Sequence, residues 1–504
     1  MVRSEPTSHA MTAAFVHEAM KTALQHVRAN HEHAALPVLD GALARAPRDP
    51  RLLQLKGLAL RNLGDLAPAL DVLQRAAREA PRDPLIAHTL ARATMEAGRP
   101  ATRLFERALT LSPGALDMML GLVAAHLAEG EAERGEALLH RESLRQPAWA
   151  QGHRELMRLR LMLGRPLESA AEGFAAAIAA RPQEPALRQA WIGALMEARR
   201  AREADEALAQ ARTALPDQPL WAMLDPLIAA MRGDADRADR GFATLGEITQ
   251  PDLLLALVRH RFAQGRHGEA LREAERGARM PGGRAFWPYL ALGWRLMGDA
   301  RWTWLEGDER LVSVIDLGPD MGSIDALAAR LRTLHLTICE PPEQTLRHGT
   351  QTDGPLFSRL DPEILQLKAA VTRAVRAHIA QLPPLDPRHP TLAMRRDQPV
   401  RYAGAWSVRL TDAGHHVDHV HHAGWLSSAF YVRTPTPTEG SADAHAGWLS
   451  LGEVRDLVPD LPPFRLVEPR PGRLVIFPSV MWHGTRPFPH GERMTVAFDV
   501  APPV

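Results

Sequence analysis

The chain has 504 residues, with 60 lysines and arginines against 59 aspartates and glutamates, and a formal net charge of +1. A chain this long exceeds what one hydrophobic core can hold, so about two to four domains are expected, and the balanced charge favours neither a nucleic-acid partner nor a membrane surface. The one cysteine, Cys339, excludes an intramolecular disulfide and fits a reducing compartment.

The N-terminal stretch MVRSEPTSHAMTAAFVHEAM lacks the apolar segment of a signal peptide. No run along the chain approaches the roughly 18 consecutive apolar residues that a membrane-spanning helix needs. We therefore expect a cytoplasmic protein without a membrane partner.

Prolines recur along the first 280 or so residues at nearly constant intervals, with successive steps of 34, 32, 34, 35, 34, 35 and 30 residues. A period near 34 is typical of the tetratricopeptide repeat, in which each helix–turn–helix unit ends near a proline. The prolines that carry this period are Pro47, Pro81, Pro113, Pro147, Pro182, Pro216, Pro251 and Pro281.

Small residues at helical spacing support this interpretation. In the copy from Pro50 to Pro81, Gly57 leaves room for the partner helix, and Leu73 is expected to fill the space between the two. Residues 12–281 thus resemble a tetratricopeptide-repeat protein of about seven or eight units. The resemblance implies an all-α superhelix whose concave surface binds a protein or peptide, or serves as the contact of a homodimer.

The period stops at MPGGR (residues 280–284), and a tryptophan-rich tract follows. We interpret residues 282–312 as a helical junction between two halves rather than a ligand cage, because large aromatic rings contribute much buried area. The repeats and the C-terminal domain are expected to have separate cores. The tryptophans of this tract are Trp287, Trp294, Trp302 and Trp304.

Two helices are predicted after the junction, at 324–335 and 361–382. Between them, LRHGTQTDGPLF (346–357) is polar and glycine-rich, without helical or strand period, so we interpret it as a loop. Arg347, Thr350 and Gln351 are candidates to line a substrate entrance there. A plain surface loop explains the same three residues equally well.

After Pro390 the pattern changes to short apolar runs between turn residues, which predicts an antiparallel double-stranded β-helix, or jelly roll, within a domain at 313–504. Its open end can collect ligands from segments that are distant in sequence. The strands are expected at about 405–410, 425–432, 447–451, 465–468, 473–477 and 494–500.

The stretch GHHVDHVHH (414–422) packs five histidines and one aspartate into eight residues directly before a strand. Ligands two residues apart on an extended segment point to the same side, and histidine is the commonest side-chain metal ligand. Two pairs fit that spacing: His416 with Asp418, and His419 with His421. His483 is the best third ligand. Chemistry favours the first pair, because it gives two histidines and one carboxylate, whereas closeness to the strand favours the second.

Arg493 follows His483 by ten residues. A planar, always-charged guanidinium suits a buried carboxylate, since two parallel hydrogen bonds fix the orientation of the anion. A close ligand pair, a distant histidine and then an arginine is the layout that an Fe(II) and 2-oxoglutarate oxygenase needs. A surface salt bridge is the plain alternative for Arg493.

The segments AWSVRL, DHVHHAGWLSSAFYV, GWLSLGE and PGRLVIFPSVMWHGTRPFPHGERMTVAFDV resemble bacterial 2-oxoglutarate- and Fe(II)-dependent oxygenases of the prolyl-hydroxylase-like superfamily, in a branch often found behind tetratricopeptide repeats. The resemblance covers about residues 310–504. It implies an iron site in which a His-x-His pair replaces the superfamily's His-x-Asp. The implied ligands are His419, His421 and His483.

The same resemblance assigns the remaining roles. Arg493 matches the residue that binds the C5 carboxylate of 2-oxoglutarate, and Tyr431 matches a strand tyrosine that shares this carboxylate. Thr495, two residues after Arg493, is expected on the same side of the strand, where its hydroxyl can add a contact. Asp418 is expected to orient a ligand histidine as a hydrogen-bond acceptor. This chain departs from the superfamily in having no carboxylate two residues after His419.

The leading hypothesis is a dioxygenase that uses Fe(II) and 2-oxoglutarate, with ascorbate as the reductant in vitro, to hydroxylate an unactivated C–H bond of a protein or peptide recruited by the repeats. The alternative is a non-catalytic repeat scaffold that carries a metal-binding, oxygenase-like barrel. A metal-storage protein or cupin-like isomerase is a third idea, but it has no use for Arg493.

Overall fold

A computed structural model describes residues 8–435 and 443–503; the first seven residues of the N-terminal stretch, and residues 436–442 and 504 of the predicted barrel domain, lie outside this description. The described residues form two compact units. One holds residues 8–139 and 353–368, and the other holds residues 140–352 and 369–503. Among the described helices, none has the length and apolar run needed to cross a membrane.

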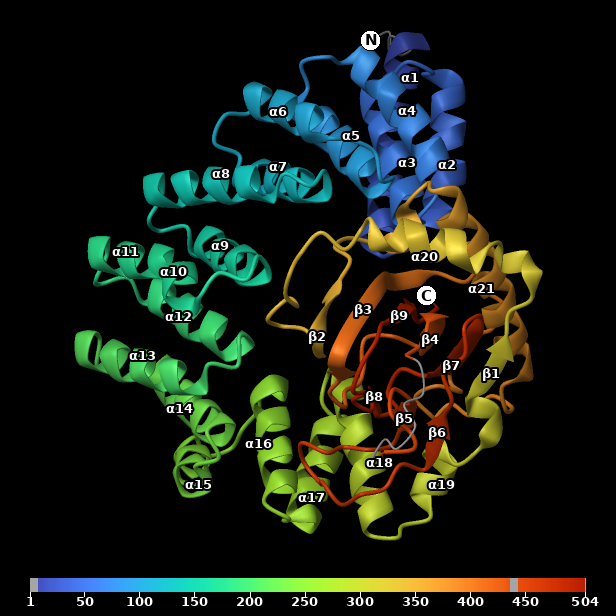
Figure 1. The fold of residues 1–504 in the computed structure, drawn as a ribbon. Helices are drawn as coiled ribbons and strands as arrows, with labels where there is room; N and C mark the ends of the chain where they lie inside the picture. The colour runs from blue at the N-terminus through green and yellow to red at the C-terminus, as the bar shows by residue number, and fades with distance from the viewer. Residues whose placement is uncertain (1–7, 436–442, 504) are drawn as a thin grey trace, which may run out of the picture. The chain divides into compact units, whose positions relative to one another are not determined.

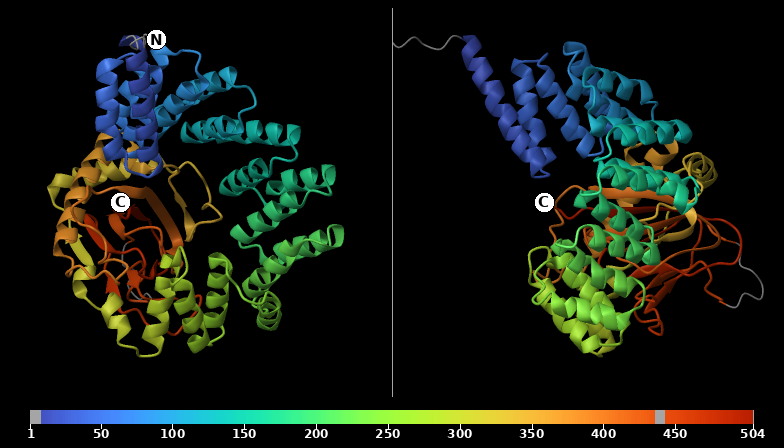
Figure 2. Two further views of the ribbon diagram at one scale, coloured as in Figure 1. Left: turned by 180° about the vertical axis from the view of Figure 1, so that it is seen from behind. Right: turned by 90° about the vertical axis from the view of Figure 1, so that its left-hand side faces the viewer.

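Successive antiparallel helices make up the first half of the chain, as the proline period predicts (Figures 1 and 2). Pro47 follows α2, Pro81 follows α4 and Pro251 begins α16, so the periodic prolines mark the boundaries between helix pairs. The helices are α1 (Ser8–Arg28), α2 (Glu32–Arg45), α3 (Pro50–Asn62), α4 (Leu66–Glu79), α5 (Pro84–Glu96), α6 (Thr102–Leu111), α7 (Leu116–Ala128), α8 (Ala132–Arg145), α9 (Ala150–Met162), α10 (Leu167–Ala170), α11 (Glu172–Ala180), α12 (Pro185–Glu197), α13 (Ala201–Ala214), α14 (Pro219–Met231), α15 (Ala235–Thr244), α16 (Pro251–Ala263) and α17 (His267–Ala278).

The start and the packing of α3 show how the sequence sets this pattern. Asp49 accepts hydrogen bonds from the backbone N–H groups of Arg51 and Leu52, while Pro50 occupies a position where no N–H is needed. A Cβ at Gly57 would lie 2.5 Å from the Leu73 side chain, so only glycine allows α3 and α4 to approach this closely. The expectation that Gly57 leaves room for the partner helix is therefore confirmed.

The tryptophan tract forms α18 (Trp287–Leu296) and α19 (Arg301–Glu306), and it packs as a joint, as predicted. One apolar cluster joins Phe262 of the repeats, Phe286 and Trp294 of the tract, and Trp482 of the β-rich region. The indole of Trp482 also donates a 3.0 Å hydrogen bond to the carbonyl of Pro288. The expectation of separate cores is therefore met only in part, because the last repeats and the β-rich region share this cluster.

Two antiparallel sheets form the C-terminal region (Figure 1), as the alternation of apolar runs and turns predicts. The larger sheet has the order β1-β7-β4-β9-β3-β2 and the smaller has the order β6-β5-β8. An apolar core lies between them, with Tyr431 and Phe477 from the larger sheet against Leu449 and Leu451 from the smaller. The strands are β1 (Ser313–Asp316), β2 (Leu346–Gln351), β3 (Tyr402–His416), β4 (Leu426–Arg433), β5 (Leu449–Leu451), β6 (Arg465–Val467), β7 (Arg473–Pro478), β8 (His483–Thr485) and β9 (Arg493–Val500).

The predicted helices at 324–335 and 361–382 are present as α20 (Ile324–Arg332) and α21 (Pro362–Gln381). The interpretation of 346–357 as a loop is wrong over its first half, because Leu346–Gln351 is strand β2 and pairs with β3. Strand β3 is also longer than predicted and reaches His416. The polar sequence of β2 does not indicate a strand by itself. The segment is extended because it pairs with β3.

Candidate metal and carboxylate site

The predicted metal ligands lie where two backbone segments pair in antiparallel orientation. His419 and His483 form an antiparallel bridge and exchange both backbone hydrogen bonds, at 2.9 and 3.0 Å. The backbone N–H of His421 donates to the carbonyl of Ser479 at 2.9 Å. This pairing places His421, two residues after His419, beside the turn between β7 and β8.

The side chains of His419, His421 and His483 converge, with one candidate ligand atom of each lying within 4.8 Å of the others. The Nδ1 atom of His419 lies 2.7 Å from the carbonyl oxygen of Val417, and that of His483 lies 3.0 Å from the carbonyl oxygen of Met481. Because a carbonyl oxygen only accepts, each Nδ1 carries the proton, which leaves Nε2 with a free electron pair. The arrangement therefore presents the nitrogen form that binds a metal.

Burial favours the uncharged forms of His419 and His483. It lowers the pKa of His419 to about 3, and the pKa of His483 lies well below its ordinary value for the same reason, with the neighbouring histidines adding to the effect. Neutral imidazoles at ordinary pH are ready to coordinate a cation without first losing a proton.

The third histidine is held by a carboxylate. Nδ1 of His421 lies 2.8 and 2.7 Å from the two carboxylate oxygens of Asp499, and the hydroxyl of Ser427 lies 2.6 Å from Oδ1 of the same group. The sequence did not single out Asp499. A signal was present, because Asp499 lies on the same face of β9 as Arg493 and Thr495, at even spacing.

The side chains of the alternative pair, His416 and Asp418, do not converge on one site. The carboxylate of Asp418 accepts hydrogen bonds from Nε and Nη2 of Arg455, at 2.8 and 2.6 Å, so it contacts an arginine instead of orienting a histidine. The expectation that Asp418 orients a ligand is therefore wrong. The ring of His416 stacks on that of His419 with centroids 5.6 Å apart, and its Nδ1 lies 3.3 Å from the hydroxyl of Thr345.

Arg493 is buried, with 2% of its surface exposed, and its Nε donates a 3.1 Å hydrogen bond to the carbonyl of Gly447. Among the described residues, no carboxylate pairs with it. Its guanidinium carbon lies 5.1 Å from the ring centre of Tyr431, whose buried hydroxyl has no hydrogen-bond partner in the same part of the chain. A buried cation and an unsatisfied hydroxyl side by side fit a carboxylate ligand, which accepts from both.

The other predicted contacts are placed as follows. Thr495 is buried on β9 and pairs across strands with Tyr431. On β2, the hydroxyl of Thr350 lies 2.7 Å from Nδ1 of His335, and Arg347 donates to the carbonyl of Gln344 at 2.9 Å. Gln351 pairs with Val408 of β3. A role of Arg347, Thr350 and Gln351 at a substrate entrance stays a prediction.

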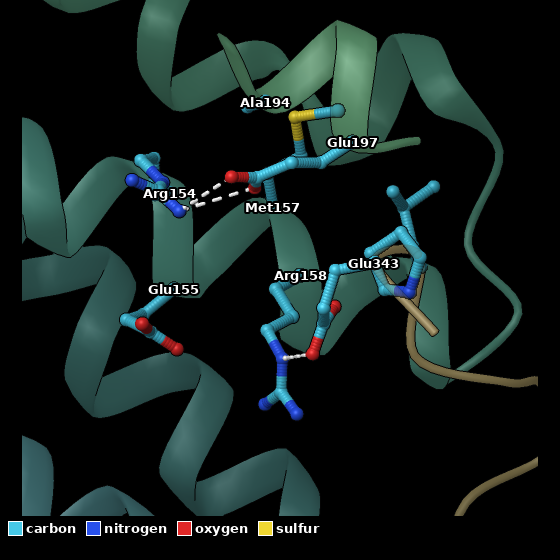
Figure 3. A pocket seen from close by; sticks show the side chains of 9 residues that line it. Arg154, Glu155, Met157, Arg158, Ala194, Glu197 and Glu343 are labelled. Atoms are coloured by element: carbon cyan, nitrogen blue, oxygen red, sulfur yellow. Dashed lines mark hydrogen bonds and ion pairs between the residues drawn. The ribbon is translucent and has the colours of Figure 1, made fainter. Parts of the chain in front are cut away.

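A cavity of about 160 Å³ lies between α9, α12 and the segment before β2 (Figure 3). Arg154 pairs with Glu197 at 2.8 Å, and Arg158 pairs with Glu343 at 3.0 Å. Both arginines that line this cavity already face glutamates, so Arg493 is the better candidate for a small carboxylate ligand.

Residues 404–499 match the family described as "Putative 2OG-Fe(II) oxygenase". The helical repeats are thus followed by a segment that matches this family and that holds the histidine cluster and Arg493. A comparison with curated protein sequences found no match.

Solved structures similar to the chain include tetratricopeptide repeat proteins. A tetratricopeptide repeat protein from Parabacteroides merdae shares 13% identity, covering 52% of this chain and 92% of its own, with a TM-score of 0.30. A thermophilic repeat protein of Thermus thermophilus shares 23% identity, covering 36% and 99%, with a TM-score of 0.28. MamA from Desulfovibrio magneticus shares 19% identity, covering 34% and 97%, with a TM-score of 0.30.

Proposed function

We propose that the protein is an Fe(II)- and 2-oxoglutarate-dependent oxygenase. The observation that carries this proposal is the convergence of His419, His421 and His483, each held through Nδ1, which leaves their Nε2 atoms available to one metal. When bound, Fe(II) and 2-oxoglutarate would activate O2, one oxygen atom of which enters succinate as CO2 is lost and the other of which hydroxylates a C–H bond.

The residues of the chain have distinct tasks in this proposal. The three histidines hold the metal and leave other coordination positions open. Arg493 binds the far carboxylate of 2-oxoglutarate, and the Tyr431 hydroxyl shares that carboxylate. Thr495 adds a hydroxyl from the same face of β9. The apolar core between the sheets excludes water from this region, which strengthens every charged contact inside it.

We further propose a protein or peptide substrate, recruited by the helical repeats. The support is the shared core, because the last repeats pack on the segment that carries the metal site. A substrate bound to these last repeats would be held by the same compact unit as the histidines.

Succinate release from 2-oxoglutarate tests the proposal, with Fe(II), ascorbate and O2 present. We expect iron-dependent release that a chelator abolishes and excess Fe(II) restores. Iron bound at one equivalent without any succinate would favour the alternative of a non-catalytic scaffold. Absence of iron binding would contradict both.

A further inference from the structure

We propose that Asp499 supplies the negative charge that the metal's own ligand set lacks, and that it does so through His421. The inference rests on the proposed metal site. It adds a positioning residue to that site and explains how three neutral histidines can stand in for two histidines and a carboxylate.

Several hydrogen bonds fix the position of the Asp499 carboxylate. Both carboxylate oxygens lie within 2.8 Å of Nδ1 of His421. The hydroxyl of Ser427 has one proton, and at 2.6 Å it donates this proton to Asp499; Ser479, 2.9 Å away, then donates to Ser427. A Cβ at Gly424 would lie 2.6 Å from Oγ of Ser479, so glycine is needed where the loop closes over this chain of hydrogen bonds.

The other ligands lack such a partner. His419 and His483 donate through Nδ1 to backbone carbonyls, which carry no net charge. Among the described residues, Asp499 is the carboxylate that lies within hydrogen-bond distance of a histidine of this cluster, and that histidine is His421; Asp418 is instead paired with Arg455. In the usual triad a carboxylate ligand brings a negative charge directly to the metal. Here the carboxylate of Asp499 brings that charge to Nδ1 of His421, on the side of the ring away from the proposed metal.

This placement has two consequences. An acceptor on Nδ1 fixes the ring orientation and the proton, so Nε2 faces the metal. A negative charge on that acceptor makes Nε2 of the imidazole a stronger electron-pair donor to the metal. It also offsets part of the positive charge of the metal. Removing such a partner typically costs about 10–100-fold in metal affinity.

The experiment compares anaerobic Co(II) titrations of wild-type protein and Asp499→Asn, followed by the visible absorption of the bound ion. The amide oxygen of asparagine still accepts from Nδ1 of His421, so this change removes the charge and retains an acceptor. We expect an affinity about 10–100-fold lower, with the melting temperature of the metal-free protein little changed. Asp418→Asn is the matched control, a buried carboxylate nearby that contacts none of the three histidines, and it should leave Co(II) affinity unchanged.

A second arm separates charge from packing. Adding His421→Asp to Asp499→Asn returns a carboxylate to the ligand set, and we expect Co(II) affinity to recover above that of the single variant, with a changed absorption spectrum. Equal affinity of wild type and Asp499→Asn would overturn the proposal, and so would a double variant that binds no better than Asp499→Asn. If wild type itself binds no Co(II), the proposed function fails instead.

Discussion

The guanidinium of Arg284 donates a 2.8 Å hydrogen bond to the carbonyl oxygen of Gly424, three residues after the proposed ligand His421. It also donates to the carbonyls of His422 and Pro390, at 2.9 and 2.8 Å. Arg284 follows the last repeat directly, in the turn Gly283–Phe286. One side chain at the end of the repeats therefore holds the loop that carries a proposed metal ligand.

Replacing Arg284 should weaken metal binding from a distance. Hydrogen bonds to charged groups contribute about 1.5–3 kcal/mol each, so Arg284→Ala should destabilise this loop by a few kcal/mol. Lysine cannot reproduce a planar fork directed at three carbonyls, so Arg284→Lys should recover little of the loss. Metal affinity and melting temperature are the measurements. Arg279→Ala, at an exposed position five residues earlier, is the control and should match wild type.

Arg493→Ala should abolish 2-oxoglutarate turnover while iron binding remains nearly intact. Losing one partner of a buried charge pair costs about 3–5 kcal/mol, which corresponds to about two to four decades in affinity. The affinity for 2-oxoglutarate can be measured by calorimetry on the metal-loaded protein without O2. Arg470→Ala removes an exposed arginine paired with Glu468 and should leave this affinity unchanged. Near-normal 2-oxoglutarate binding by Arg493→Ala would contradict the assignment.

The proposed ligand set predicts opposite outcomes for two neighbouring residues. His421→Ala should lose bound iron, whereas Asp418→Ala should retain it, because the carboxylate of Asp418 faces Arg455 and not the histidine cluster. Asp418→Ala should instead lower the melting temperature, since it breaks a partly buried ion pair with good geometry. Iron content after gel filtration distinguishes the two. Loss of iron from the aspartate variant alone would restore the pair His416 and Asp418 as the ligands.

Local spacing predicted much of this architecture, and long-range contacts account for what it missed. The prolines and Gly57 mark repeat boundaries and close helix contacts, both of which are short-range properties. Polar strand β2 carries no apolar alternation, and it is ordered by pairing with β3. Even spacing along β9 places Asp499 on the same face as Arg493, but it does not identify the partner of Asp499, because His421 lies 78 positions away in the sequence.

The packing of the last repeat helix against Phe286 can be tested with two glycines. A Cβ at Gly277, in α17, would lie 2.4 Å from the ring of Phe286, whereas a Cβ at Gly193, in α12, would meet no atom within 4 Å. Overpacking costs about 1–3 kcal/mol, and alanine gains up to about 1 kcal/mol over glycine in a helix. Gly277→Ala should therefore lower the free energy of unfolding, while Gly193→Ala should raise it slightly. Equal effects of the two changes in denaturant unfolding would contradict tight packing at Phe286.

Glu306 gives the stability of the joint a pH dependence. Its carboxyl group is buried in α19, where Trp302 donates to Oε2 at 3.0 Å and Oε1 has no hydrogen-bond partner among the described residues. Burial raises its pKa to about 7, against the opposing effects of Trp302 and Arg295. The folded state therefore keeps a proton that the unfolded chain releases near pH 4.5, so folding stability falls as pH rises from about 4.5 to about 7 and levels off above that range.

Glu306→Gln removes this titration and retains an acceptor for Trp302. The pKa difference corresponds to on the order of 3 kcal/mol, so the glutamine variant should be more stable than wild type by about that amount at pH 8. The advantage should shrink as pH falls and disappear near pH 4.5, because both side chains are then uncharged in both states. Denaturant unfolding of the two proteins across this range measures the difference directly, since other titrating groups cancel. A stability difference that stays constant between pH 4.5 and pH 8 would show that Glu306 does not hold its proton in the folded protein.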